Sequence, residues 1–115
     1  MSLIIPNKIE LEYSPGITIE KIKSAIARHL PNYKIFRPFG IGIRELRYGK
    51  SIAAKRRGAT ALVLVSVKHN ERSNKSTIFI QGSFRVGGFL FYMASKKDSF
   101  ERVEEAIRLE IPNMV

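Results

Sequence analysis

The segment RYGKSIAAKRRG, residues 47–58, holds five basic side chains and no acidic one. Lys and Arg at this density neutralise phosphates, and aromatic rings among them can stack on unpaired bases. The candidate phosphate contacts, including the arginine just upstream, are Arg44, Arg47, Lys50, Lys55, Arg56 and Arg57, with Tyr48 as the stacking ring. These residues form the candidate nucleic-acid-binding site.

The net charge is concentrated around this segment. The chain has 20 Lys and Arg against 10 Asp and Glu, a formal charge of +10. Residues 33–58 contain eight of the cations and one acid, so they carry +7. A local field of this kind attracts a polyanion such as nucleic acid without specifying which one. Because phosphate contacts carry no sequence information, we expect weak base specificity.

One other interpretation of the basic segment stays open. Its aromatic side chains could face the core and leave a charged surface that only keeps the protein soluble. The protein would then be a protein-interaction module or a small apolar ligand-binding module, and the aromatic-rich residues 76–93 would line its pocket. We do not expect an anionic membrane surface as the partner, because residues 50–57 offer little apolar surface for insertion.

Catalytic and metal-binding patterns are weak. Neither His29 nor His69 has a carboxylate at a spacing that suggests a catalytic dyad. The triplet Gly49-Lys50-Ser51 resembles the end of a P-loop, but the glycine required five residues earlier is Arg44. The chain has no cysteine, which excludes disulfides and thiolate metal sites. We therefore expect a non-enzymatic binding protein without a cofactor.

Neither a targeting signal nor a membrane-spanning segment is evident. The longest apolar runs, residues 59–67 and 87–94, have the length of buried strands, well short of the roughly 18 residues of a membrane span. The first ten residues lack the basic and apolar regions of a secretory signal. We expect a soluble, cytoplasmic protein and, at 115 residues, a single domain over residues 1–115.

The first thirty residues predict a strand followed by a helix. Residues 8–13 alternate apolar and charged side chains, which is the pattern of a strand with one solvent-exposed face. In residues 18–30, apolar side chains recur every three or four positions, which is the pattern of an amphipathic helix. Thr18 is placed to cap the first turn of that helix.

The middle of the chain has the composition of strands. The run at 59–68 is rich in Val and Leu and predicts a central strand covered on both faces. Pro38 interrupts residues 33–39, which favours an edge strand that could pair across a homo-oligomer. The other predicted strands are residues 40–48, 51–56, 77–86 and 88–94.

Residues 98–110 predict a second amphipathic helix, with Asp98 and Glu101 as an acidic capping box and Pro112 as its end. The order is then one strand, a helix, four to five strands and a helix. Short connections make neighbouring strands antiparallel, and the two apolar helix faces must be buried on the sheet. We predict an α+β two-layer sandwich: a mainly antiparallel sheet of about five to six strands, with both helices on one face.

Overall fold

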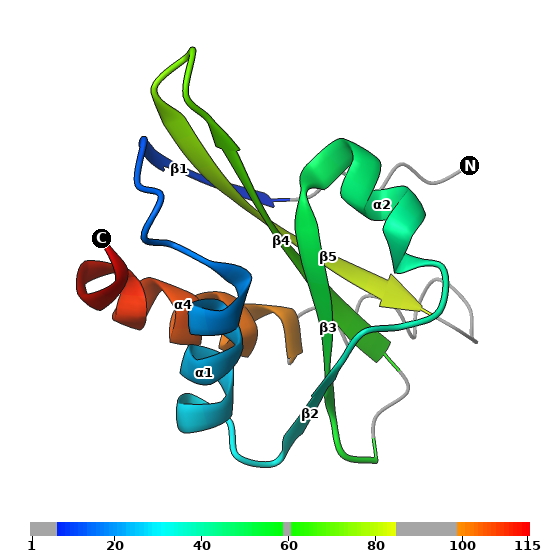
Figure 1. The fold of residues 1–115 in the computed structure, drawn as a ribbon. Coiled ribbons are helices and arrows are strands. Elements are labelled where there is room, and N and C mark those ends of the chain that lie inside the picture. Colours follow the sequence, from blue (N-terminus) through cyan, green and yellow to red (C-terminus); the bar gives the residue numbers. More distant parts are fainter. Residues whose placement is uncertain (1–6, 59–60, 85–98) are drawn as a thin grey trace.

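The computed structural model describes residues 7–58, 61–84 and 99–115, and these form an antiparallel sheet with helices on both of its faces (Figure 1). The predicted α+β class and the mainly antiparallel sheet are confirmed. The strand predicted at 88–94 lies outside the described residues. In chain order the elements are β1 (Asn7–Glu12), α1 (Ile19–His29), β2 (Tyr33–Phe36), α2 (Ile41–Tyr48), β3 (Lys50–Arg56), β4 (Ala61–Asn70), β5 (Lys75–Phe84) and α4 (Glu101–Met114).

The five strands lie in the order β1-β5-β4-β3-β2, and every neighbouring pair is antiparallel. β3, β4 and β5 follow one another as a meander, with β4 at the centre as predicted. β1 and β2 occupy the two edges, so α1 carries the chain from one edge to the other. Val65 of β4 lies opposite both Ile52 and Ile80, and this register places all three side chains on one face of the sheet.

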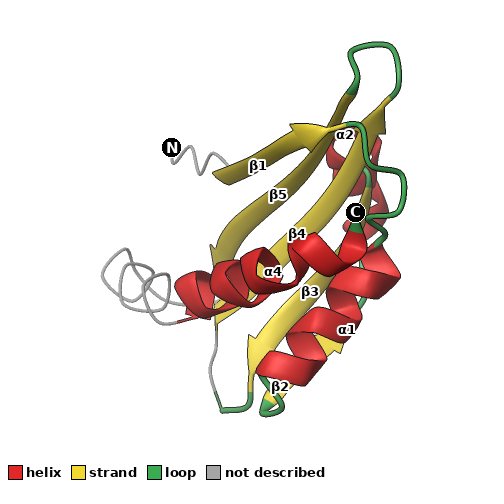
Figure 2. Ribbon diagram, turned by 90° about the vertical axis from the view of Figure 1, so that its left-hand side faces the viewer, coloured by secondary structure: helices red, strands yellow, loops and turns green. Residues whose placement is uncertain are grey.

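α1 and α4 cover this apolar face and contribute to one core (Figure 2). Ile22 and Ile26 of α1 and Val103 and Ile107 of α4 are fully buried. The prediction that Thr18 caps α1 is confirmed, because its Oγ1 accepts a hydrogen bond from the Lys21 N–H at 3.2 Å. The periodic apolar face of residues 18–30 therefore positions α1 as expected.

The prediction of a strand at residues 40–48 is wrong, because Ile41–Tyr48 form helix α2. α2 lies on the face of the sheet opposite α1 and α4 (Figure 2). Its buried or half-buried side chains are Ile41, Arg44, Glu45 and Tyr48. Positions i, i+3, i+4 and i+7 lie on one side of a helix, so this spacing turns those four toward the sheet. The pattern was hidden because three of the four are polar or amphipathic.

The last helix also differs from its predicted limits. α4 continues through Pro112 and ends at Met114. Met114 is buried in the core and the Val115 N–H donates to the Ile111 carbonyl, so tertiary packing and one backbone bond hold the final turn. Asp98 lies outside the described residues, and the residue before the helix, Phe100, makes no side-chain cap.

Candidate nucleic-acid interface

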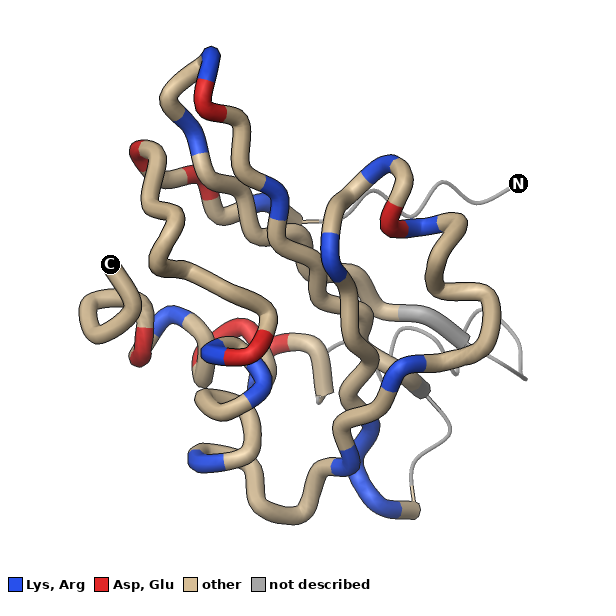
Figure 3. The backbone as a smooth tube through the Cα atoms, in the orientation of Figure 1, with Lys and Arg blue, Asp and Glu red and all other residues tan. Residues whose placement is uncertain are grey.

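The structure places the seven predicted site residues in three different surroundings. Arg44 and Tyr48 lie between α2 and the sheet, whereas Arg47 and Lys50 follow at the C-terminal end of α2. The remaining cations, Lys55, Arg56 and Arg57, lie at the far end of β3. Basic residues are visible at both ends of β3 in Figure 3. The candidate residues therefore do not form one continuous surface.

Arg44 is held inside the contact between α2 and the sheet. Its Nε donates to Ser66 Oγ at 2.9 Å, and one of its terminal nitrogens donates to the side chain of Gln81. Ser66 is fully buried and its hydroxyl lies 2.6 Å from Ser51 Oγ. Burial lowers the pKa of the Arg44 guanidinium, and its Nη2 is buried without a hydrogen-bond partner. Arg44 therefore attaches α2 to β4 and β5 through its guanidinium.

Tyr48 supports this contact. Its ring packs at a steep angle on Phe79, with 4.9 Å between the centroids. The Cζ atoms of Arg44 and Arg47 lie 4.6 and 5.5 Å from the centroid of the Tyr48 ring. The half-buried ring is thus already occupied by two cations and an aromatic neighbour, which leaves little of its face for a stacked base.

The cations at the C-terminal end of α2 are Arg47, Lys50 and Lys68, which we call the α2 end cations. The Lys68 Nζ donates to the Arg47 carbonyl at 3.1 Å. Positive charge is favourable at this position, because the last carbonyls of a helix carry partial negative charge. All three residues are exposed.

A second basic group, the β2–β3 corner, consists of Lys34, Lys55, Arg56 and Arg57. Lys34 and Lys55 lie directly opposite each other in the register of β2 and β3. The Arg57 N–H donates to the Asn32 carbonyl at 3.1 Å, which holds the turn after β3 against the start of β2. Of the carboxylates in the described ranges, none forms an ion pair with Lys34, Lys55 or Arg57.

Lys34 was absent from the predicted site. Lys34 and Lys55 are 21 positions apart in the sequence, and only the antiparallel pairing of β2 with β3 brings them together. Like charges directly opposite on neighbouring strands repel each other and destabilise the pairing. An anion bound between them would remove that repulsion. The signal available from sequence was a lysine in each of two predicted strands, but the strand predicted between them at residues 40–48 is helix α2.

The histidines have partners that their sequence spacing did not indicate. His29 Nε2 lies 3.2 Å from Glu110 Oε2, although 81 positions separate the two residues in the sequence. Arg28 shares this carboxylate, and hydrogen bonding, chiefly from His29, lowers the pKa of Glu110. No hydroxyl group is bonded to this pair among the residues that the structure describes.

His69 has a structural role. Its Nε2 lies 2.8 Å from the Ile17 carbonyl, which can only accept, so Nε2 carries the proton and donates. Its Nδ1 accepts from the buried Ser76 hydroxyl at 2.7 Å. The Ser76 oxygen in turn accepts from the Ser14 N–H. This arrangement ties the segment before α1 to the β4–β5 hairpin and leaves the serine inaccessible as a nucleophile.

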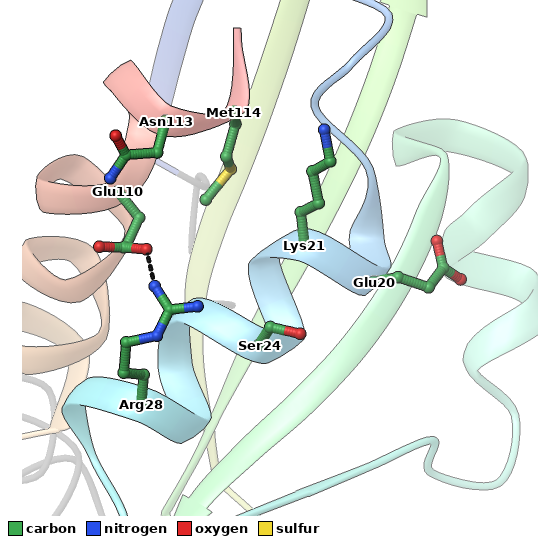
Figure 4. A pocket seen from close by; sticks show the side chains of 7 residues that line it. All are labelled: Glu20, Lys21, Ser24, Arg28, Glu110, Asn113 and Met114. Carbon is green, nitrogen blue, oxygen red and sulfur yellow. Dashed lines mark hydrogen bonds and ion pairs between the residues drawn. The ribbon is translucent and has the colours of Figure 1, made fainter.

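Side chains of α1 and α4 line a pocket, which Figure 4 shows from close by. All of its lining residues but Met114 are polar or charged: Glu20, Lys21, Ser24, Arg28, Glu110, Asn113 and Met114. The predicted apolar pocket was to be lined by residues 76–93, none of which lines the pocket of Figure 4. Phe79 packs on Tyr48, and residues 85–93 lie outside the described part of the chain, so the apolar-ligand interpretation stays a prediction.

No protein-family model, curated protein or solved structure matches this chain. Within the described ranges, no helix is long and apolar enough to cross a membrane. The functional assignment therefore rests on the geometry and charge of the residues described above.

Proposed function

We propose that the protein is a non-enzymatic module that binds the phosphate backbone of nucleic acid at the β2–β3 corner. The observation that carries this proposal is the pairing of Lys34 with Lys55 beside Arg57, with no described carboxylate to neutralise them. Arg56 adds a fourth positive charge at the same strand end. Lys34 and Lys55 on adjacent strands, with Arg57 beside them, form a site for consecutive phosphates.

The other candidate residues take different roles in this proposal. Arg44 and Tyr48 keep α2 on the sheet, as their hydrogen bonds and ring contacts indicate. Lys50 lies six residues before Arg56 on β3, a separation of about 20 Å at the usual rise of a strand. The α2 end cations are therefore a separate group, and binding at the corner does not require them.

The proposal predicts a definite salt dependence. Each phosphate that the corner neutralises contributes about −0.9 to the slope of log affinity against log salt concentration on duplex DNA. Three or four contacts give a slope of about −3. Fluorescence anisotropy measures this slope over a series of salt concentrations, with mixed-sequence DNA and RNA in single- and double-stranded form. An affinity that does not change with salt, or no binding at low salt, would contradict the proposal.

A further inference from the structure

The apolar side chains of α2 are arranged opposite to those of an ordinary surface helix. α2 turns the polar side chains of Arg44 and Glu45 toward the sheet, where they are hydrogen bonded. It turns Ile43 and Leu46 outward, with exposed fractions of 78% and 86%. Phe39, in the turn just before the helix, is fully exposed. Surface helices normally bury such residues and expose the charged ones.

These three side chains form one surface, which we call the α2 apolar patch. The spacing 39, 43 and 46 places Ile43 and Leu46 on the same side of the helix, with Phe39 one turn earlier in the chain. Ile43 and Leu46 project outward from α2, and Phe39 projects from the turn before it. Large apolar side chains that project together from a surface mark a contact with a protein or a membrane.

The charges beside the patch favour an anionic partner. The α2 end cations Arg47, Lys50 and Lys68 follow directly at one end of the helix. The acid on α2, Glu45, is neutralised by Arg37, with 2.6 and 2.7 Å between the paired nitrogens and oxygens. Glu45 is also the only acid in residues 33–58. The patch therefore lies in a region of net positive charge.

Size and charge together favour a lipid surface over a protein. The three side chains expose on the order of 500 Å², whereas a stable protein interface needs about 800 Å² on each partner. A second copy of this chain would bring the same cations against each other. A bilayer accepts a small projecting apolar patch, and its anionic headgroups attract the flanking lysines and arginines.

We propose that α2 docks on anionic membrane surfaces, with Phe39, Ile43 and Leu46 inserted at the level of the headgroups and the α2 end cations contacting lipid phosphates. Residues 50–57 by themselves offer little apolar surface for insertion into a bilayer. α2, expected as a strand, supplies that surface next to the cations. This site is separate from the β2–β3 corner, so the two proposals can fail independently.

Vesicle co-sedimentation of the full chain tests the docking. The vesicles are phosphatidylcholine alone, and phosphatidylcholine mixed with phosphatidylglycerol. We expect binding to the anionic vesicles only, weakened about tenfold or more in an Ile43→Gln/Leu46→Gln variant. The matched control is Leu109→Gln/Val115→Gln, which changes two exposed apolar residues at the other end of the molecule and keeps full binding. Binding that the α2 variant leaves unchanged, or no binding to anionic vesicles, would overturn the proposal.

A second measurement does not depend on comparing two folded variants. The chain contains four tyrosines and no tryptophan, so Phe39→Trp introduces a single tryptophan in the patch, which can be excited selectively. We expect its emission to shift to the blue on addition of anionic vesicles and to stay unchanged with neutral ones. An emission shift that instead follows protein concentration without lipid, together with a dimer in light scattering, would show that a second copy covers the patch and would overturn the membrane assignment.

Discussion

Arg37 and Glu45 form a bidentate ion pair that encloses the start of α2, with 2.6 and 2.7 Å between the paired atoms. The same carboxylate accepts a hydrogen bond from the Ser51 N–H at 2.9 Å, at the beginning of β3. Glu45 therefore links the segment before α2 to the strand after it. This carboxylate therefore ties α2 to the segments on both of its sides.

The Glu45 contacts predict a dependence of stability on acidic pH. Hydrogen bonds from Arg37 and then from Ser51 lower the pKa of Glu45 from 4.5 to about 2. The unfolded chain takes up this proton at a higher pH than the folded protein does, so the stabilisation is complete above pH 4.5 and is lost as the pH falls toward 2. Urea unfolding at a series of pH values should show Glu45→Gln less stable by about 1–3 kcal/mol near neutral pH. The difference should shrink as the pH falls toward 2.

The control for this prediction is the exposed pair between Arg108 and Glu104 on α4. Neutralising Arg108 with Gln should change the free energy of unfolding by less than about 0.5 kcal/mol, because exposed i,i+4 pairs contribute little. An equal loss in the two variants, or a Glu45→Gln deficit that does not vary with pH, would show that Glu45 does not hold α2 through its charge.

Arg44 and Arg47 are both predicted phosphate contacts, but replacing each with alanine should change the free energy of unfolding by different amounts. Arg44→Ala removes hydrogen bonds to the buried Ser66 and to Gln81, and should lower the free energy of unfolding by about 1–3 kcal/mol. Arg47→Ala changes an exposed side chain and should stay within about 0.5 kcal/mol. Chemical denaturation of the two variants checks the difference. Equal stability in both would mean that Arg44 does not attach α2 to the sheet.

Gly42 in α2 and Gly49, between α2 and β3, should respond oppositely to alanine. Gly49 has φ +87°, and a Cβ there would lie 2.2 Å from the Val67 carbonyl oxygen. Gly49→Ala should therefore destabilise the protein by at least about 2 kcal/mol. Gly42 has nothing within 4 Å of an added Cβ, so Gly42→Ala should stabilise the helix by about 0.5–1 kcal/mol. Thermal unfolding of both variants decides this, and a stable Gly49→Ala protein would contradict the described turn.

The elements that sequence predicted correctly are those whose apolar side chains face the core. α1 has such a face and a threonine cap, and β4 has a continuous apolar run, so both were found. α2 was missed because it buries Arg44 and Glu45 and exposes Ile43 and Leu46, and because glycines flank and interrupt it. A search for apolar periodicity cannot find a helix whose inward face is polar.

The sequence indicated most of the basic residues that belong to the candidate site, but not how the fold groups them in space. The density of Lys and Arg in residues 44–57 was visible at once, but their distribution into a buried contact and two surface groups depends on α2. Lys34 joins Lys55 only through the pairing of β2 with β3. His29 likewise meets Glu110 only where α1 packs on α4. Long-range partners of this kind are set by tertiary structure and leave no local pattern in the chain.

The most direct test of nucleic-acid binding at the β2–β3 corner compares two variants of equal charge. Lys34→Gln/Lys55→Gln/Arg57→Gln neutralises the corner, and Lys8→Gln/Lys21→Gln/Arg72→Gln removes three exposed cations elsewhere. Anisotropy titrations with mixed-sequence DNA and RNA should show the salt slope of about −3 retained in the control and nearly abolished in the corner variant. Equal weakening in both variants would mean that only net charge matters, and would contradict a phosphate site at this corner.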